Sequence, residues 1–227
     1  MRLATLIILL SSFSIVAQAQ NEETRSLASF TVLETGGSWD VILEKGDKEE
    51  VRLEGSNIDL DKVITEVKNN ELHIYLEKGN YNNIRLKVYV TYQNLEEIHK
   101  SGSGNLINKS DLSASDFELH LSGSGNADLR NIDAENLLVN LSGSGNLSMT
   151  GGRAQKLAIE QSGSGNVNAM GLQIDDCAVN KSGSGNVEIS VSQSLEVVSS
   201  GSGNIKYKGS PSINKVEFSG SGKLVKS

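Results

Sequence analysis

The chain has 227 residues, of which 37% are hydrophobic and 22% charged, with 23 glycines, one proline and one cysteine. This apolar content suffices for a packed core, while a single cysteine excludes a disulfide framework and a cysteine-rich zinc site. The net charge of −7 argues against nucleic acid as a partner, because phosphate binding needs clustered positive charge.

The first 19 residues have the pattern of a secretory signal peptide. Arg2 precedes an apolar run from Leu3 to Leu10, and Ala17-Gln18-Ala19 predicts cleavage between Ala19 and Gln20. The alternative is an uncleaved anchor, but the unbroken apolar run is short for a bilayer core about 30 Å thick. We therefore expect residues 1–19 to be removed. The mature chain is expected to carry no transmembrane segment and to be exported to the periplasm, the cell surface or the medium.

Residues 27–99 form a leader made of short strand-like segments. The segment at 84–90 alternates between apolar and polar residues, and Asn69-Asn70 separates two further segments in the manner of a hairpin turn. No long helical pattern is found. We expect an irregular β region that covers one end of the repeats that follow, within a single domain of residues 20–227.

Residues 100–227 are dominated by a repeated phrase, Ser-Gly-Ser-Gly-Asn, here called the corner phrase. A recurrence of about 20 residues is typical of one coil of a β-solenoid, in which each coil contacts only its neighbours. Glycine permits a tight corner, and the stacked asparagines are expected to form a hydrogen-bonded ladder. Six complete copies stand at 101–105, 122–126, 142–146, 162–166, 182–186 and 200–204, and a seventh begins at Ser219 and ends in Lys223.

Apolar residues stand at fixed distances from the corner phrase in all seven coils. Polar residues largely alternate with them, which predicts strands with one buried face. The predicted fold is all-β: a right-handed parallel β-helix or solenoid with about 20-residue coils, preceded by an irregular β cap. A second connection in each coil varies in sequence and is expected to be a loop. The column three residues before the phrase holds Ile98, Leu119, Val139, Ile159, Val179, Val197 and Val216, and the column five residues after its start holds Leu106, Ala127, Leu147, Val167, Val187, Ile205 and Leu224.

Two segments connect the chain to a known family. Gly36-Gly37-Ser38-Trp39-Asp40-Val41, and Leu95-Glu96-Glu97-Ile98 leading into serial corner phrases, resemble the putative auto-transporter adhesin family with a head GIN domain. The resemblance extends from about Phe30 to the end of the chain. It implies a pectin-lyase-like β-helix without catalytic residues, a role in cell adhesion and assembly into trimers.

The residue types that carry catalysis are present without the arrangement that catalysis needs. The serines recur in every coil, as scaffolding does, and a nucleophile elbow would need Gly-x-Ser-x-Gly. The lone Cys177 is expected to be a small buried side chain. We therefore predict no catalytic residues, no cofactor-binding residues and no cofactor. The carboxylate pairs Asp133/Glu135 and Asp175/Asp176 are expected to be solvated.

The histidines and the aromatic residues also favour structural roles. His73, His99 and His120 are scattered along the chain, although His99 and His120 are expected near each other on adjacent coils. Two imidazoles hold a metal ion weakly and no third ligand is evident, so no metal site is predicted. Core or rim packing is expected for Trp39, Tyr81 and Tyr92, with stacking on sugars as the alternative.

Repetition without a unique chemical site favours an exported, non-enzymatic adhesion or surface-interaction module. Its partner would be a surface or extracellular ligand, either protein or glycan, and self-association into an oligomer is a further expectation. The alternatives are a carbohydrate-binding module, a catalytically degenerate lyase, or an envelope protein whose role is oligomerisation.

Overall fold

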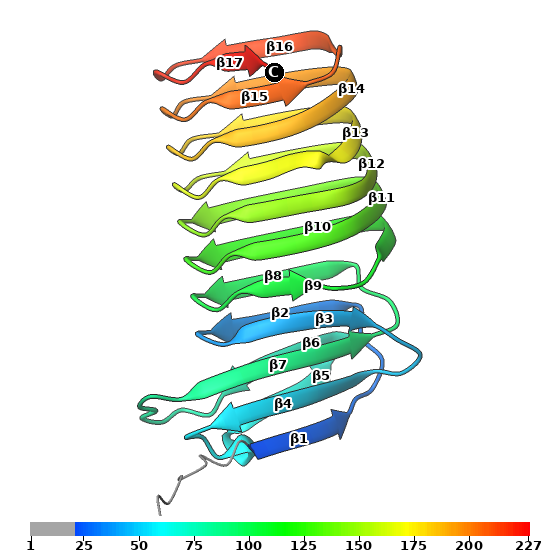
Figure 1. The fold of residues 1–227 in the computed structure, drawn as a ribbon, viewed down its shortest axis with the longest axis vertical. Helices are drawn as coiled ribbons and strands as arrows, with labels where there is room; N and C mark the ends of the chain where they lie inside the picture. The colour runs from blue at the N-terminus through cyan, green and yellow to red at the C-terminus, as the bar shows by residue number, and fades with distance from the viewer. Residues whose placement is uncertain (1–20) are drawn as a thin grey trace, which may run out of the picture.

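The computed structural model describes residues 21–227, and the predicted signal peptide lies outside this range. The described chain is nearly all β, with 17 strands hydrogen-bonded into one continuous sheet and a 3₁₀ turn, η1 (Leu60–Lys62). The sheet winds into a stack of coils, with β1 (Asn21–Ser26) at one end and the C-terminal strands at the other (Figure 1). Within residues 21–227, no helix has the length and apolar character needed to cross a membrane.

The corner-phrase repeats form a parallel β-solenoid with coils of about 20 residues, as predicted. Each strand pairs in parallel with its counterpart one coil away, which places Val139 beside Ile159 and Ile159 beside Val179. These three side chains are at most 2% exposed. The predicted apolar column therefore runs through the interior of the stack. The long middle strands are β10 (Leu112–Gly123), β11 (Ala127–Gly143), β12 (Leu147–Gln161), β13 (Val167–Lys181) and β14 (Val187–Ser199).

The last coil is less buried than its sequence pattern suggests. It consists of β15 (Ile205–Lys208), β16 (Ser212–Phe218) and β17 (Leu224–Lys226), and Val216 is 42% exposed although it continues the buried column. A register shift in the β14–β16 pairing also sets Ile213, rather than Asn214, opposite Leu195. The apolar pattern continues to the end, but within the described chain no further coil covers it.

The corner phrase makes a bend so tight that neither of its glycines has room for a side chain. A Cβ atom added to Gly145 would overlap the carbonyl oxygen of Gly125 in the coil below, although the φ angle of Gly145 is not in the left-handed region. Gly143, the other glycine of the same phrase, does need a positive φ, of 136°. Glycine is thus required at both positions for close approach, and at Gly143 also for its backbone conformation.

The predicted asparagine ladder is present, and both the backbone and the side chain of each residue contribute to it. Asn126 donates from its backbone N–H (3.1 Å) and from Nδ2 (3.3 Å) to Oδ1 of Asn105 in the preceding coil. The same pair of bonds joins Asn146 to Asn126 at 3.0 Å each, and the pattern repeats through Asn186. Every rung donates towards the N-terminus, so the ladder has a direction.

In the middle coils the second bend is part of the sheet and not the loop that was expected, whereas non-strand residues form it between β9 and β10 and between β15 and β16. β11 and β12 continue through it with Arg130 paired to Thr150 and Ile132 paired to Gly152. The Ile132 side chain is fully buried there. This bend takes part in the backbone hydrogen bonding between strands and also contributes side chains to the core. Its sequence variation is therefore accommodated by register shifts, as between β12 and β13, and not by projecting loops.

The N-terminal part is an irregular sheet, but it contains a coil that is out of chain order. β2 (Val32–Gly37) pairs with both β6 (Glu71–Leu76) and β8 (Glu97–Gly102), and β3 (Asp40–Lys45) pairs with both β7 (Arg85–Tyr92) and β9 (Leu106–Asn108). The β2–β3 coil therefore lies between two coils that come later in the sequence (Figure 1).

The β2–β3 coil copies the corner of the repeats with a different sequence. Gly36 and Gly37 lie beside Ser101 and Gly102, and Oδ1 of Asp40 accepts the backbone N–H and Nδ2 of Asn105, both at 2.9 Å. Asp40 thus occupies the first rung of the asparagine ladder. An aspartate suits this rung because it only has to accept.

Antiparallel strands close the N-terminal end of the stack. β4 (Glu50–Ser56) pairs antiparallel with β7 and with β1, and β5 (Val63–Lys68) pairs antiparallel with β6. The predicted hairpin between β5 and β6 is confirmed, with Asn69 and Asn70 both at positive φ. The whole stack shares one core, to which the N-terminal part contributes Phe30, Leu33 and Leu72.

Candidate interaction face

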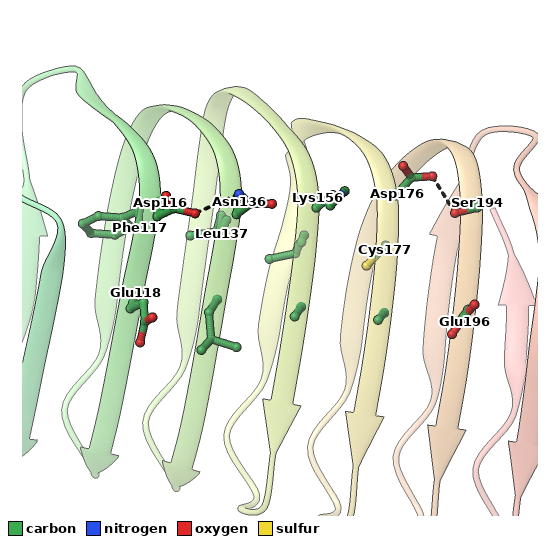
Figure 2. Close-up of a pocket in the computed structure, with 14 residues that line it drawn as sticks. Asp116, Phe117, Glu118, Asn136, Leu137, Lys156, Asp176, Cys177, Ser194 and Glu196 are labelled. Carbon is green, nitrogen blue, oxygen red and sulfur yellow. Dashed lines mark hydrogen bonds between the residues drawn. The ribbon is translucent and has the colours of Figure 1, made fainter.

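The outer surface of β10–β14 carries two parallel rows of side chains, here called the groove face. Strand alternation turns these residues outward while their sequence neighbours point into the core. They line a groove with a volume of about 390 Å³ that crosses β10–β14, and Figure 2 shows the side chains along it. One row is Asp116, Asn136, Lys156, Asp176 and Ser194, and the other is Glu118, Leu138, Ala158, Ala178 and Glu196.

Hydrogen bonds between coils hold the first row in place. Asn136 Nδ2 donates to Asp116 Oδ1 at 2.8 Å, and Ser194 Oγ donates to Asp176 Oδ1 at 2.5 Å. Both bonds are drawn in Figure 2. Lys156 lies between these two pairs in the register of the sheet. The row is therefore an ordered polar edge with one basic residue among two acidic ones.

The second row is apolar in its middle and acidic at its ends. Leu138 and Ala158 are half-buried and Ala178 is exposed, so these three positions form an accessible apolar floor. Glu118 and Glu196 stand at opposite ends of this floor (Figure 2). An apolar strip bounded by carboxylates is suited to a partner that offers apolar groups flanked by positive charge.

The thiol next to this groove is not a reactive group. Cys177 lies between Leu157 and Leu195 in an inward column and is 3% exposed. Burial raises the pKa of its thiol to about 12, which keeps it protonated at neutral pH. The expectation of a small buried side chain is confirmed.

The carboxylate pairs considered in the sequence lie on strands, and one of them is held by a basic residue. Asp175 accepts from Arg153 Nη2 at 2.5 Å and from Ser192 Oγ at 3.0 Å. The hydrogen bond from Arg153, and to a smaller extent that from Ser192, lowers the pKa of Asp175. Asp133 and Glu135 are exposed on β11. A carboxylate held ionised in this way serves as a link between coils and not as a general acid.

Of the three aromatic residues considered for sugar stacking, two belong to the core. Trp39 is 6% exposed and its Nε1–H donates to Thr35 Oγ1 at 3.2 Å, while Tyr92 is 2% exposed. The packing expectation is confirmed for these two. Tyr81 is half-buried and lines a separate cleft of about 730 Å³ near the N-terminal end, together with Trp39, Glu54 and Arg85.

The histidines are not scattered in space, which corrects the sequence interpretation. Glu34 pairs with His73 on one side and with His99 on the other, and His99 pairs with His120. All three histidines thus share one outward column. The rings of His99 and His120 are stacked, with centroids 4.5 Å apart and planes 4° apart. The proximity of these two was predicted, whereas the alignment of His73 requires the out-of-order β2–β3 coil.

Sequence reasoning missed two buried lysines just before the corner phrase. Lys100 is 5% exposed and Lys181 1% exposed, and their Nζ atoms donate to the carbonyl oxygens of Ser101 and Gly183 at 2.6 and 2.5 Å. Desolvation lowers the pKa of both amines. The same position holds Leu121 in another coil, which is the sequence signal that it faces inward.

A family model described as putative auto-transporter adhesin, head GIN domain, matches residues 29–211. The chain belongs to this adhesin family. The family resemblance drawn from the Gly36–Val41 segment and the serial corner phrases is therefore confirmed. A search of the curated proteins found no match.

Solved structures with the same fold cover nearly the whole of this chain. A putative adhesin from Bacteroides fragilis aligns with a TM-score of 0.86 at 22% identity, covering 93% of this chain and 98% of that one. A putative adhesin from Parabacteroides distasonis aligns with a TM-score of 0.73 at 21% identity, covering 92% of this chain and 97% of that one. A putative lipid binding protein from the same species gives 0.70 at 27% identity, covering 90% and 97%. The two adhesin structures, at these identities, show a common fold.

Proposed function

We propose that this protein is an exported, non-enzymatic adhesin whose groove face binds a protein on another surface. Membership of the adhesin family and the names of its structural neighbours support the adhesion role. The signal-peptide pattern of residues 1–19 supports export. The observation that carries the proposal is the groove face itself, an ordered surface with an apolar floor on a rigid sheet.

The composition of the groove face indicates the chemistry of the partner. Four carboxylates line the groove, those of Asp116, Glu118, Asp176 and Glu196, against the single amine of Lys156. A partner with apolar side chains next to lysine or arginine would match both the floor and its rim. Association should therefore weaken as salt screens the charges.

The proposal is tested by a substitution in the groove floor and a matched one outside the groove, near the start of β13. Ala158→Arg introduces a bulky charge into the floor and is expected to reduce binding of the purified protein to intact cells at least about tenfold. Asn168→Arg introduces the same side chain at an exposed position outside the groove and is expected to leave binding unchanged. Equal binding by both variants, or no binding by the wild type to any cell or protein-coated surface, would overturn the proposal.

A second candidate, glycan binding, is favoured by the cleft that contains Tyr81. Aromatic rings with nearby carboxylates are suited to sugar recognition, and Tyr81, Glu54 and Asp40 are all among the residues that line this cleft. Because Trp39 is packed and hydrogen-bonded, Tyr81 is the ring available for stacking. Binding on a glycan array that is lost in Tyr81→Ala, but kept in Ala158→Arg, would favour this function over protein adhesion.

A further inference from the structure

Three side chains from two adjacent coils converge on the outer surface near the junction of the leader with the repeats. Glu97 and His99 lie two residues apart on β8 and therefore face the same side, and His120 on β10 lies directly beside His99. One ligand atom from each of the three residues lies within 4.8 Å of the other two. Neither histidine is buried, since the side chains are 41% and 30% exposed, so the cluster is open to solvent.

Two of the separations within this cluster, both from His120 Nε2, are close to those that a tetrahedral ion requires. Two ligand atoms about 2.1 Å from one zinc ion lie about 3.4 Å apart. His120 Nε2 is 3.5 Å from Glu97 Oε1 and 3.3 Å from Glu118 Oε2, and His99 Nε2 is 2.5 Å from Glu97 Oε1. An ion bound by both Nε2 atoms would replace the short contact between His99 and Glu97, and both rings are partly exposed to solvent.

We propose that Glu97, His99 and His120 form a binding site for a divalent transition-metal ion, with Zn²⁺ as the best-matched ion. Two imidazoles and one carboxylate are a known ligand set for zinc, and imidazole favours zinc over the hard cations Ca²⁺ and Mg²⁺. Glu118 supplies a fourth ligand or leaves that position to water. The structure places Glu97 beside both histidines, a candidate third ligand that was not evident in the sequence.

Asn140 provides a positioning contact behind His120. Its side-chain amide lies 3.2 Å from His120 Nδ1, on the opposite side of the ring from Nε2. A metal-bound imidazole carries its proton on the other ring nitrogen and donates it to an outer partner. Rotating the Asn140 amide by half a turn presents its oxygen to that proton. Asn140 would then fix the ring with Nε2 directed at the ion.

The same column contains a natural control. Glu34, Glu71 and His73 also bring three ligand atoms within 4.8 Å, but this second group offers one imidazole and two carboxylates. His73 Nδ1 is already bonded to Glu34 Oε2 at 2.9 Å. With fewer nitrogen ligands, it is expected to bind zinc more weakly than the Glu97–His99–His120 group.

Calorimetric titration of the tag-free protein with Zn²⁺ tests the site. The wild type is expected to bind one zinc ion more tightly than any other. His99→Gln and His120→Gln should each weaken that tightest binding by at least about tenfold. Glu97→Gln keeps the shape but removes the charge and should weaken it to a smaller extent. His73→Gln should leave the tightest binding unchanged. Co²⁺ in place of Zn²⁺ should give the visible absorption of a tetrahedral ion, and Ca²⁺ should not compete.

The outcomes separate this site from the proposed adhesion. Thermal unfolding without metal checks that each variant is folded, which is expected because the side chains are partly exposed. Saturable zinc binding that is equal in the wild type and in a His99→Gln/His120→Gln double variant would overturn the site, as would the absence of saturable binding. Loss of zinc binding with cell binding intact would leave the adhesion proposal standing, and loss of cell binding in Ala158→Arg would leave the metal site standing.

Discussion

The corner-phrase coils and the N-terminal part fill one core, but they keep the chain in register by different means. In β10–β14 each coil repeats the contacts of the one before it, through apolar columns and the asparagine ladder. In β1–β9 the strands run in both directions, and Arg25 ties β1 to η1 and β5 through the carbonyl oxygens of Leu60 and Val63. Repetition is thus enough to extend a stack, whereas ending it requires residues used only once.

The largest expected effect comes from a charge in the middle of the stack. Val139→Asp buries an unpaired carboxylate in the apolar column and is expected to cost more than about 4 kcal/mol of unfolding free energy. Val216→Asp makes the same change in the same column at the open end, where the side chain is 42% exposed, and should cost less than about 1 kcal/mol. Urea unfolding followed by circular dichroism compares the two. Similar losses would mean that the last coil is as well covered as the middle.

A methyl group at the corner should be almost as damaging. Gly145→Ala places its Cβ against the carbonyl oxygen of Gly125, so the two coils must separate, at an expected cost of about 3 kcal/mol. Ser144→Ala, one residue earlier and exposed, should change stability by less than about 0.5 kcal/mol. The midpoints of thermal unfolding measure both. Equal losses of stability in the two variants would show that the corner is sensitive to any substitution and not to the added Cβ.

The ladder allows equivalent positions of the two regions to be compared. Asn146→Asp removes a donor from an inner rung and sets a carboxylate against Oδ1 of Asn126, with an expected cost of about 2 kcal/mol. Asp40→Asn keeps the accepting oxygen at the first rung, where no donor is used, and should cost less than about 1 kcal/mol. Chemical unfolding of the two variants gives the comparison. A larger loss for Asp40→Asn would show that its charge, and not its place in the ladder, stabilises the junction.

The smallest expected effect is the pH dependence that arises from Lys181. Desolvation lowers its pKa in the folded protein below the unfolded value of about 10.4, so the folded state holds the proton less well. The resulting cost to stability is present below the folded pKa and disappears as the pH rises from there to the unfolded value. Lys181→Met should therefore stabilise the protein at pH 7 by up to about 1 kcal/mol, with a gain that shrinks towards pH 10.

Unfolding of the wild type and Lys181→Met by urea at pH 7 and at pH 10 provides the measurement. Comparing the two proteins at each pH cancels the contributions of Cys177 and Tyr92, whose pKa values burial raises to about 12 in both proteins. A gain that is the same at both pH values would show that the lysine acts through its shape alone.

The regular coils could be predicted from the sequence because each structural position recurs in several successive coils. Val139, Ile159 and Val179 could be checked against one another, and so could the asparagines of the ladder. The β2–β3 coil could not be placed in the same way. Its position between two later coils depends on strand pairings far apart in sequence, and its corner lacks the Ser-Gly-Ser-Gly-Asn sequence. This single placement brings Glu34 between His73 and His99.

The interaction face and the metal cluster were harder to predict for a related reason. Sequence patterns separate inward from outward residues, but Leu138, Ala158 and Ala178 are outward apolar residues that gain meaning only as adjacent members of one row. In the same way, the contact of Glu97 with two histidines can be recognised only when its strand and the rotation of its side chain are known. Repetition defines the scaffold, and the differences between coils define its sites.

The one-way donation of the asparagine ladder has a consequence for how such rods change length. Every inner coil presents the same acceptors to the coil above and the same donors to the coil below, so a block of about 20 residues can be duplicated or lost without creating an unmatched junction. Each such event would change the length of the stack by about 4.8 Å and would leave the terminal strands at both ends unchanged. The single direction of hydrogen bonding in this column therefore allows the length of the protein to change by whole coils.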